Sequence, residues 1–98
     1  MNRAMIDYRY DEQSLRIIEV DNTEDMEFNI QIVDEGAYLE GIKQVKAFFD
    51  DNRVYTDVLF YAYNNNEYRV IVREDYYVDF ILAMFKHRLL KSVEWKNA

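Results

Sequence analysis

The chain of 98 residues contains no cysteine and no proline, and it has only two glycines. Without cysteine it forms neither disulfides nor thiolate-based metal or catalytic sites. Because glycine and proline are so scarce, we expect few long loops and mostly regular structure. No apolar run approaches the roughly 20 residues that a membrane helix needs, and the N-terminal residues lack the apolar core of a signal peptide. The expected location is therefore the cytoplasm.

Residues for nucleophilic catalysis are equally scarce. His87 is the only histidine, and it lies in a basic segment at the end of an expected helix. Ser14 and Ser92 are the only serines. The usual pairs of nucleophile and base need these residue types close together, so we expect no catalytic site.

The acids from Asp21 to Glu27 have the spacing of the first ligands in a calcium-binding loop. That loop requires glycine at its sixth position and glutamate at its twelfth, where this chain has Met26 and Ile32. The motif is therefore absent. The sequence predicts neither a metal site nor a cofactor.

The chain does contain enough apolar material for a core. Half of its residues are hydrophobic and 16% are aromatic, which is unlike an intrinsically disordered chain. Its length predicts a single domain that covers residues 1–98.

Negative charge is concentrated in the first half of the chain. The net charge is −7, but residues 1–51 carry 13 acidic and 5 basic side chains, whereas residues 52–98 carry 6 and 7. A field of this sign repels phosphate backbones and attracts basic surfaces. Five acids fall close together without a basic side chain among them: Glu19, Asp21, Glu24, Asp25 and Glu27. We expect them to bind a basic protein rather than nucleic acid; the alternative is that they only keep the domain soluble.

The segment Val54–Arg73 gives the clearest structural signal. Two β-prone runs flank Asn64–Asn66, and asparagine tolerates the left-handed backbone of tight turns. A three-residue loop pairs Tyr63 with Glu67 and sorts apolar side chains onto one face, whereas a loop one residue longer mixes the faces. The predicted register also sets two pairs opposite each other, Asp57 with Arg73 and Tyr61 with Arg69.

Apolar periodicity predicts the other elements. Strands are expected at residues 5–10, 15–20, 26–33 and 89–95, and helices at residues 36–50 and 74–86. The first two strands should form an antiparallel hairpin. Apolar residues on the inner faces define a predicted core: Phe28, Ile30, Ile42, Phe49, Phe60, Val70, Ile81, Phe85 and Trp95.

The predicted order β-β-β-α-β-β-α-β describes an α+β domain with two helices on one face of a mostly antiparallel sheet. From about residue 26 onward, the order βαββαβ is that of a ferredoxin-like fold. In a competing arrangement the first three strands form a meander, and the third strand then lacks the two later neighbours that the ferredoxin-like order requires.

The outer face of the predicted hairpin is a second candidate binding surface. It carries tyrosine and arginine, which concentrate binding energy in protein interfaces: Tyr55, Tyr61, Tyr63, Arg69 and Arg73. Several occupants of this face are open at this point. They are the N-terminal hairpin or a second copy of the chain, a different protein, or else RNA or a small ligand. RNA is disfavoured, because residues 67–73 lack the glycine-aromatic pattern of RNA-recognition strands and the net charge has the wrong sign.

Two classes of function follow from these features. The first is a non-enzymatic protein-interaction module, an inhibitor or modulator of the antitoxin, immunity or phage-inhibitor type. It would bind a basic surface of its partner, such as one that holds nucleic acid. The second is a small-ligand-binding or enzymatic ferredoxin-like domain with a pocket between sheet and helices. A deep cavity lined by tyrosine and a buried carboxylate would favour the second class, and a filled core with a flat acidic face the first.

Overall fold

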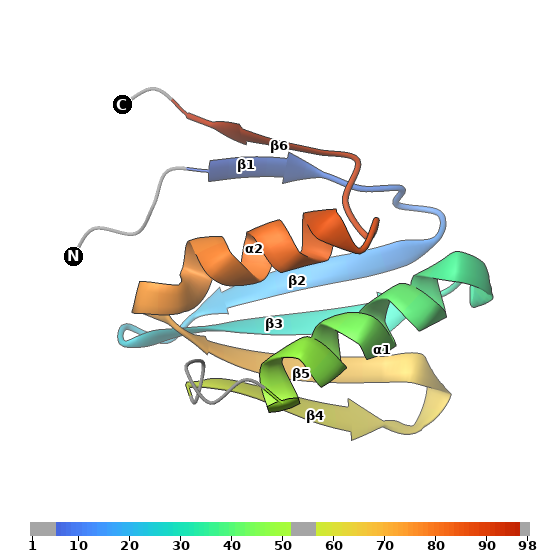
Figure 1. The fold of residues 1–98 in the computed structure, drawn as a ribbon, viewed down its shortest axis with the longest axis horizontal. Coiled ribbons are helices and arrows are strands. Elements are labelled where there is room, and N and C mark those ends of the chain that lie inside the picture. Colours follow the sequence, from blue (N-terminus) through green and yellow to red (C-terminus); the bar gives the residue numbers. More distant parts are fainter. Residues whose placement is uncertain (1–5, 52–56, 97–98) are drawn as a thin grey trace.

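Two helices cover one face of a four-stranded antiparallel sheet (Figure 1). The computed structural model describes residues 6–51 and 57–96. The strands lie in the order β2-β3-β5-β4, with β2 at Leu15–Asp21, β3 at Asp25–Ile32, β4 at Val58–Tyr63 and β5 at Glu67–Arg73. The helices are α1 (Gly36–Asp51) and α2 (Tyr77–Lys86), and 3₁₀ turns form at Asn64–Asn66 and Glu74–Tyr76. A second sheet pairs β1 (Ile6–Arg9) with β6 (Ser92–Trp95). The expected α+β architecture is confirmed.

The central strand β3 alternates between buried and half-buried side chains, because only one face of the sheet meets the helices. A tight turn joins it to β2. Thr23 in this turn has a positive φ of 76°, and its amide donates a hydrogen bond to the Asp21 carboxylate at 3.0 Å. The inward residues of β3 are at most 3% exposed: Met26, Phe28, Ile30 and Ile32.

The hairpin of β4 and β5 has the predicted register. Tyr63 pairs with Glu67 across the three-residue loop. Asn65 and Asn66 adopt left-handed backbone, with φ values of 65° and 59°, as the choice of asparagine implies. The register therefore agrees with the apolar alternation and the turn chemistry that predict it.

Both predicted outer pairs of this hairpin form. Asp57 Oδ2 lies 3.9 Å from Arg73 Nη1. The guanidinium carbon of Arg69 lies 5.5 Å from the centre of the Tyr61 ring, within the range of a cation–π contact. Both pairs lie on the face of the hairpin that points away from the helices.

The predicted hairpin between residues 5–10 and 15–20 is wrong. β1 pairs with β6, and β2 pairs with β3. The reason lies in Tyr10, whose hydroxyl accepts a hydrogen bond from the Ile17 amide and donates one to the Ile17 carbonyl, both at 3.3 Å. A side chain thus occupies the edge of β2 to which the backbone of a partner strand would bind.

The last strand also departs from the ferredoxin-like order. That order requires β6 beside β3, but β2 holds this position. Only Asn22–Glu24 separate β2 from β3, so closing this loop costs far less entropy than returning β6 across the sheet. The order β3-β5-β4 agrees with the prediction, and the competing meander holds for β2 and β3 alone.

Most of the predicted core is confirmed. Phe60 is half-buried against the core, but Phe85 and Trp95 are 45% and 67% exposed and do not belong to it. Phe85 lies beside the buried stripe of α2, in which Met84 takes the inward position. Trp95 is exposed because β6 lies outside the main sheet. Six predicted residues are at most 2% exposed: Phe28, Ile30, Ile42, Phe49, Val70 and Ile81.

Aromatic rings fill the space between the sheet and the helices. The rings of Phe28 on β3 and Phe80 on α2 lie 4.6 Å apart. Phe49 on α1 lies 6.0 Å from Phe80 and 6.3 Å from Phe60 on β4. These separations are typical of packed aromatic pairs. This phenylalanine cluster (Phe28, Phe49, Phe60 and Phe80) holds both helices on the same face of the sheet.

Gly41 sets the approach of α1 to the end of α2. A Cβ atom at this position would lie 2.8 Å from the His87 carbonyl oxygen, so a larger residue would push the two elements apart. At this close approach the His87 Nδ1 atom lies 2.9 Å from Gln44 Oε1, a hydrogen bond. His87 therefore takes part in helix packing.

The phenylalanine cluster predicts a large stability effect. Phe49→Ala should reduce the free energy of unfolding by about 3 to 5 kcal/mol, because it leaves a cavity in a packed core. Phe85→Ala is the matched control, and since Phe85 is 45% exposed its loss should stay below about 1.5 kcal/mol. Urea titrations of the two variants measure this difference. Equal losses in the two variants would show that Phe49 is no more a part of the packed core than Phe85.

Candidate functional site

The face of the sheet that points away from the helices is covered by no described element. We call it the open face. Several of its apolar side chains are exposed, including Ile18 at 61% and Tyr63 at 51%. The strand registers place these residues on the open face: Arg16, Ile18 and Val20; Asp25, Glu27, Asn29 and Gln31; Glu67, Arg69, Ile71 and Arg73; Leu59, Tyr61 and Tyr63.

The five acids proposed as one binding set are divided between the two faces of the sheet. Glu19 pairs with Phe28, so its side chain lies on the face that meets the helices. Asp21 pairs with Met26 and shares that side. The other three acids lie in the β2–β3 turn or on the open face: Glu24, Asp25 and Glu27.

The acidic end of the open face is hollowed. A depression of about 150 Å³ is lined by three carboxylates, two apolar residues and an arginine: Glu24, Asp25, Asp57, Leu59, Ile71 and Arg73. Arg73 lies opposite Asp25 and also pairs with Asp57. One arginine thus faces three acids, so this end keeps a negative field.

The other end of the open face is aromatic and basic. A shallow depression of about 510 Å³ spans β2, β3, β5 and the end of β4, and Arg16, Arg69 and Tyr63 are among its lining residues. The Nε atom of Arg69 is buried and has no hydrogen-bond partner among the described residues. Four residues of the second candidate set therefore share the open face with the acids: Tyr61, Tyr63, Arg69 and Arg73. Tyr55 lies outside the described residues.

Sequence reasoning missed the contribution of β2 to this surface. Ile18 and Val20 are 61% and 41% exposed, and they extend the apolar part of the open face beyond the β4–β5 hairpin. The signal was the run Ile17–Ile18, since two adjacent apolar residues in a strand point to opposite faces. Adjacent apolar residues in an edge strand therefore predict apolar side chains on both faces of the sheet.

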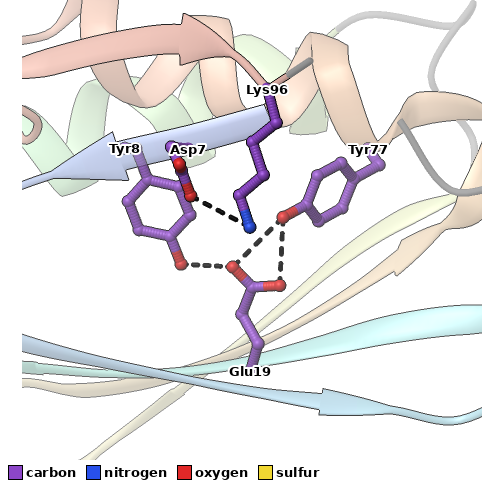
Figure 2. Close-up of polar contacts among 5 residues, drawn as sticks. All are labelled: Asp7, Tyr8, Glu19, Tyr77 and Lys96. Carbon is purple, nitrogen blue, oxygen red and sulfur yellow. Dashed lines mark hydrogen bonds and ion pairs between the residues drawn. The ribbon is translucent and has the colours of Figure 1, made fainter. Parts of the chain in front are cut away.

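Glu19 has a structural role on the opposite face (Figure 2). It accepts hydrogen bonds from the hydroxyls of Tyr8 on β1 and Tyr77 on α2; the Tyr77 distances are 3.1 and 3.2 Å. We call Tyr8, Glu19 and Tyr77 the Glu19 cluster. Beside it, an ion pair joins Asp7 and Lys96 at 3.1 Å. Burial, and next the hydrogen bond to Glu19, raise the pKa of Tyr8 far above its ordinary value. The Glu19 cluster thus fastens the β1–β6 sheet to α2 and β2.

The hollow next to Tyr77, which Asp21 and Glu74 also line, has a volume of about 10 Å³, room for one water molecule at most. Among residues 6–51 and 57–96, no group of three His, Cys, Asp or Glu side chains is placed to hold a metal ion. Within the same ranges, neither helix is long and apolar enough to cross a membrane.

Comparison of the chain with protein-family models, with curated proteins and with solved structures finds no match.

The Glu19 cluster predicts a stability effect that depends on pH. Tyr8→Phe removes one donor to Glu19 but keeps the ring, so it should cost about 1 to 2 kcal/mol at neutral pH. A tyrosine whose pKa is raised on folding contributes stability that is fully present below a pH of about 10 and is lost above it. The wild type should therefore lose stability more steeply than Tyr8→Phe above a pH of about 10.

Urea titrations at a series of pH values, from neutral to alkaline, measure this difference. Tyr63→Phe is the control, because Tyr63 is 51% exposed on the open face and its hydroxyl should add nothing to stability. If Tyr8→Phe and Tyr63→Phe follow the same curve, the Glu19 cluster does not hold the β1–β6 sheet in place.

Proposed function

We propose that this protein is a non-enzymatic protein-interaction module, an inhibitor or modulator that binds a basic surface of a partner protein through the open face of its sheet. One observation carries the proposal: three acids of the first candidate set and four residues of the second lie on or next to one uncovered face. Tyrosine and arginine supply contact energy, and the acids supply attraction over a longer range.

Charge complementarity selects the kind of partner. The depression lined by Glu24, Asp25 and Asp57 is an acceptor site for a lysine or arginine side chain. Leu59 and Ile71 in the same depression can pack against the apolar stem of that side chain. A partner with basic residues amid an apolar surface complements both parts. A nucleic-acid-binding surface has this character, and the protein would act by covering it.

The second class of function, a ligand-binding or enzymatic domain with a pocket between sheet and helices, has less support. The phenylalanine cluster occupies that space, with ring centres 4.6 to 6.3 Å apart. Glu19, a carboxylate on the side of the sheet that meets the helices, already accepts hydrogen bonds from Tyr8 and Tyr77. A reactive carboxylate needs room for a substrate beside it, and the hollow that Asp21, Glu74 and Tyr77 line offers about 10 Å³.

The test begins with capture of a partner from a lysate of the source cells and measurement of its association rate at several salt concentrations. The variant Glu24→Gln, Asp25→Asn, Glu27→Gln removes the charge of the open-face acids. We expect it to slow association about tenfold at low salt and to flatten the salt dependence, because steering by these charges is lost.

A matched control removes the same number of charges elsewhere. Glu12, Glu40 and Asp51 are exposed and lie away from the open face, so changing them to the amides gives the same net charge. This control should associate nearly as fast as the wild type. Equal slowing of both variants would show that the open-face acids act only through the net charge of the protein. An unchanged association rate in the open-face variant would reject the proposal.

A further inference from the structure

We infer that the outer edge of β4 binds the β4 edge of a second copy of this chain, and that the two sheets join into one. The inference starts from the composition of the strand. β4 is an edge strand of the main sheet, yet Val-Leu-Phe-Tyr-Ala-Tyr contains no charge, no proline and no glycine. Such an edge invites pairing with another strand unless it is protected.

The other edge of the same sheet is protected by several devices. β2 carries three charged side chains: Arg16, Glu19 and Asp21. The Tyr10 hydroxyl binds both backbone groups of Ile17, and the Glu19 cluster holds β1 beside the strand. Charges and covering elements of this kind are how proteins prevent edge pairing. No described element protects the outer edge of β4 from pairing in a comparable way.

The hydrogen bonds within the hairpin determine which groups of β4 point outward. The Arg73 amide donates to the Asp57 carbonyl at 3.1 Å, so Asp57 and every second residue after it turn their backbone groups toward β5. The residues between them, Val58, Phe60 and Ala62, turn their backbone groups to the outer edge. These three residues are the ones that can bind another strand.

The charge of the hairpin favours a second copy as the occupant. The chain as a whole has a net charge of −7, but residues 57–73 carry two acids and two arginines. The hairpin that holds the β4 edge therefore has no net charge, so a like-charged copy meets less repulsion there than at the acidic N-terminal half. A basic strand would find no charge on β4 to bind, whereas a neutral apolar strand fits, and β4 is itself such a strand.

A two-fold axis through Tyr61 gives the best register. Antiparallel pairing about this axis sets Tyr61 opposite its copy and Leu59 opposite Tyr63 of the second copy. These three side chains are 43%, 48% and 51% exposed in one chain, and each gains an apolar partner. Phe60 and Ala62 then form the hydrogen-bonded pairs, in agreement with their outward backbone groups.

This dimer would place both open faces on the same side, because the two-fold axis is perpendicular to the sheet. The partner-binding surface would then extend across eight strands, twice the four of one main sheet. Pairing through one strand buries little area, so the dimer should dissociate on dilution. The inference does not depend on the proposed function, since it concerns the edge of the sheet and not its face.

The absence of cysteine from the chain permits a direct test by cross-linking. Directly opposed residues that are not hydrogen-bonded have Cα atoms about 4.5 Å apart, a distance that a disulfide can span. Tyr61→Cys treated with oxidised glutathione should therefore form a covalent dimer at least about tenfold faster than Val20→Cys. Val20 is the matched control, because it is 41% exposed on the open face but lies on β2, at the far edge.

The register has its own test. A mixture of Leu59→Cys and Tyr63→Cys proteins should give the mixed dimer in preference to either symmetric one. Face-to-face association of two chains would instead cross-link Val20→Cys readily. Equal rates for Tyr61→Cys and Val20→Cys would overturn the inference.

Sedimentation velocity of proteins without introduced cysteine provides an independent measurement. The wild type should show a monomer–dimer equilibrium between about 5 and 500 µM. Ala62→Lys adds a charge at an exposed, outward position of the edge and should weaken the dimer at least about tenfold. Ala37→Lys adds the same charge on exposed α1 and should leave the dimer unchanged. A wild type that stays monomeric over the whole range rejects the inference.

Discussion

The structure depends on which strands occupy the two edges of β3. The three-residue turn that ends β2 gives β3 one neighbour, and the crossover through α1 and β4 delivers β5 as the other. Once both edges are filled, β6 cannot lie beside β3. It pairs with β1, and the resulting two-stranded sheet needs side-chain bonds to hold it. Tyr10 and the Glu19 cluster provide them. The short loop between β2 and β3 closes at a low cost in entropy. It therefore determines where β1 and β6, at the two ends of the described chain, can pair.

The same arrangement leaves the open face uncovered. The phenylalanine cluster holds both helices on one side of the sheet, and Tyr8 of the β1–β6 sheet bonds to Glu19 on that side as well. Apolar residues such as Ile18 and Leu59 consequently remain 61% and 48% exposed. A small acidic domain has alternatives to such exposure, since polar residues at these positions would cost little stability. Retention of apolar and aromatic side chains on the open face is the argument for a binding role.

The features that could be predicted from the sequence were local ones. The β4–β5 register follows from Asn64–Asn66 and the alternation beside it, and the cores of β3, α1 and α2 follow from their own periods. The partners of β1 and β6 could not be predicted in this way, because their pairing depends on which other edge is already filled. Trp95 is wrongly predicted as core for the same reason, because β6 belongs to a different sheet. The sequence predicts two separate candidate sets, one of acids and one of tyrosines and arginines. Only the strand order shows that members of both lie on one face of the sheet.

The distribution of acids shows why a charge count does not by itself define a surface. Residues 19–27 contain five acids, but the two-residue period of a strand sends Glu19 and Glu27 to opposite faces. Glu19 then serves the fold through Tyr8 and Tyr77, while Glu27 remains on the open face. Both still contribute to the long-range field, which depends on distance and not on the direction of a side chain. Attraction of the proposed basic partner would therefore be a property of the whole N-terminal half. The position at which such a partner binds must come from the short-range contacts of the open face, from Leu59, Tyr61, Tyr63 and Arg69.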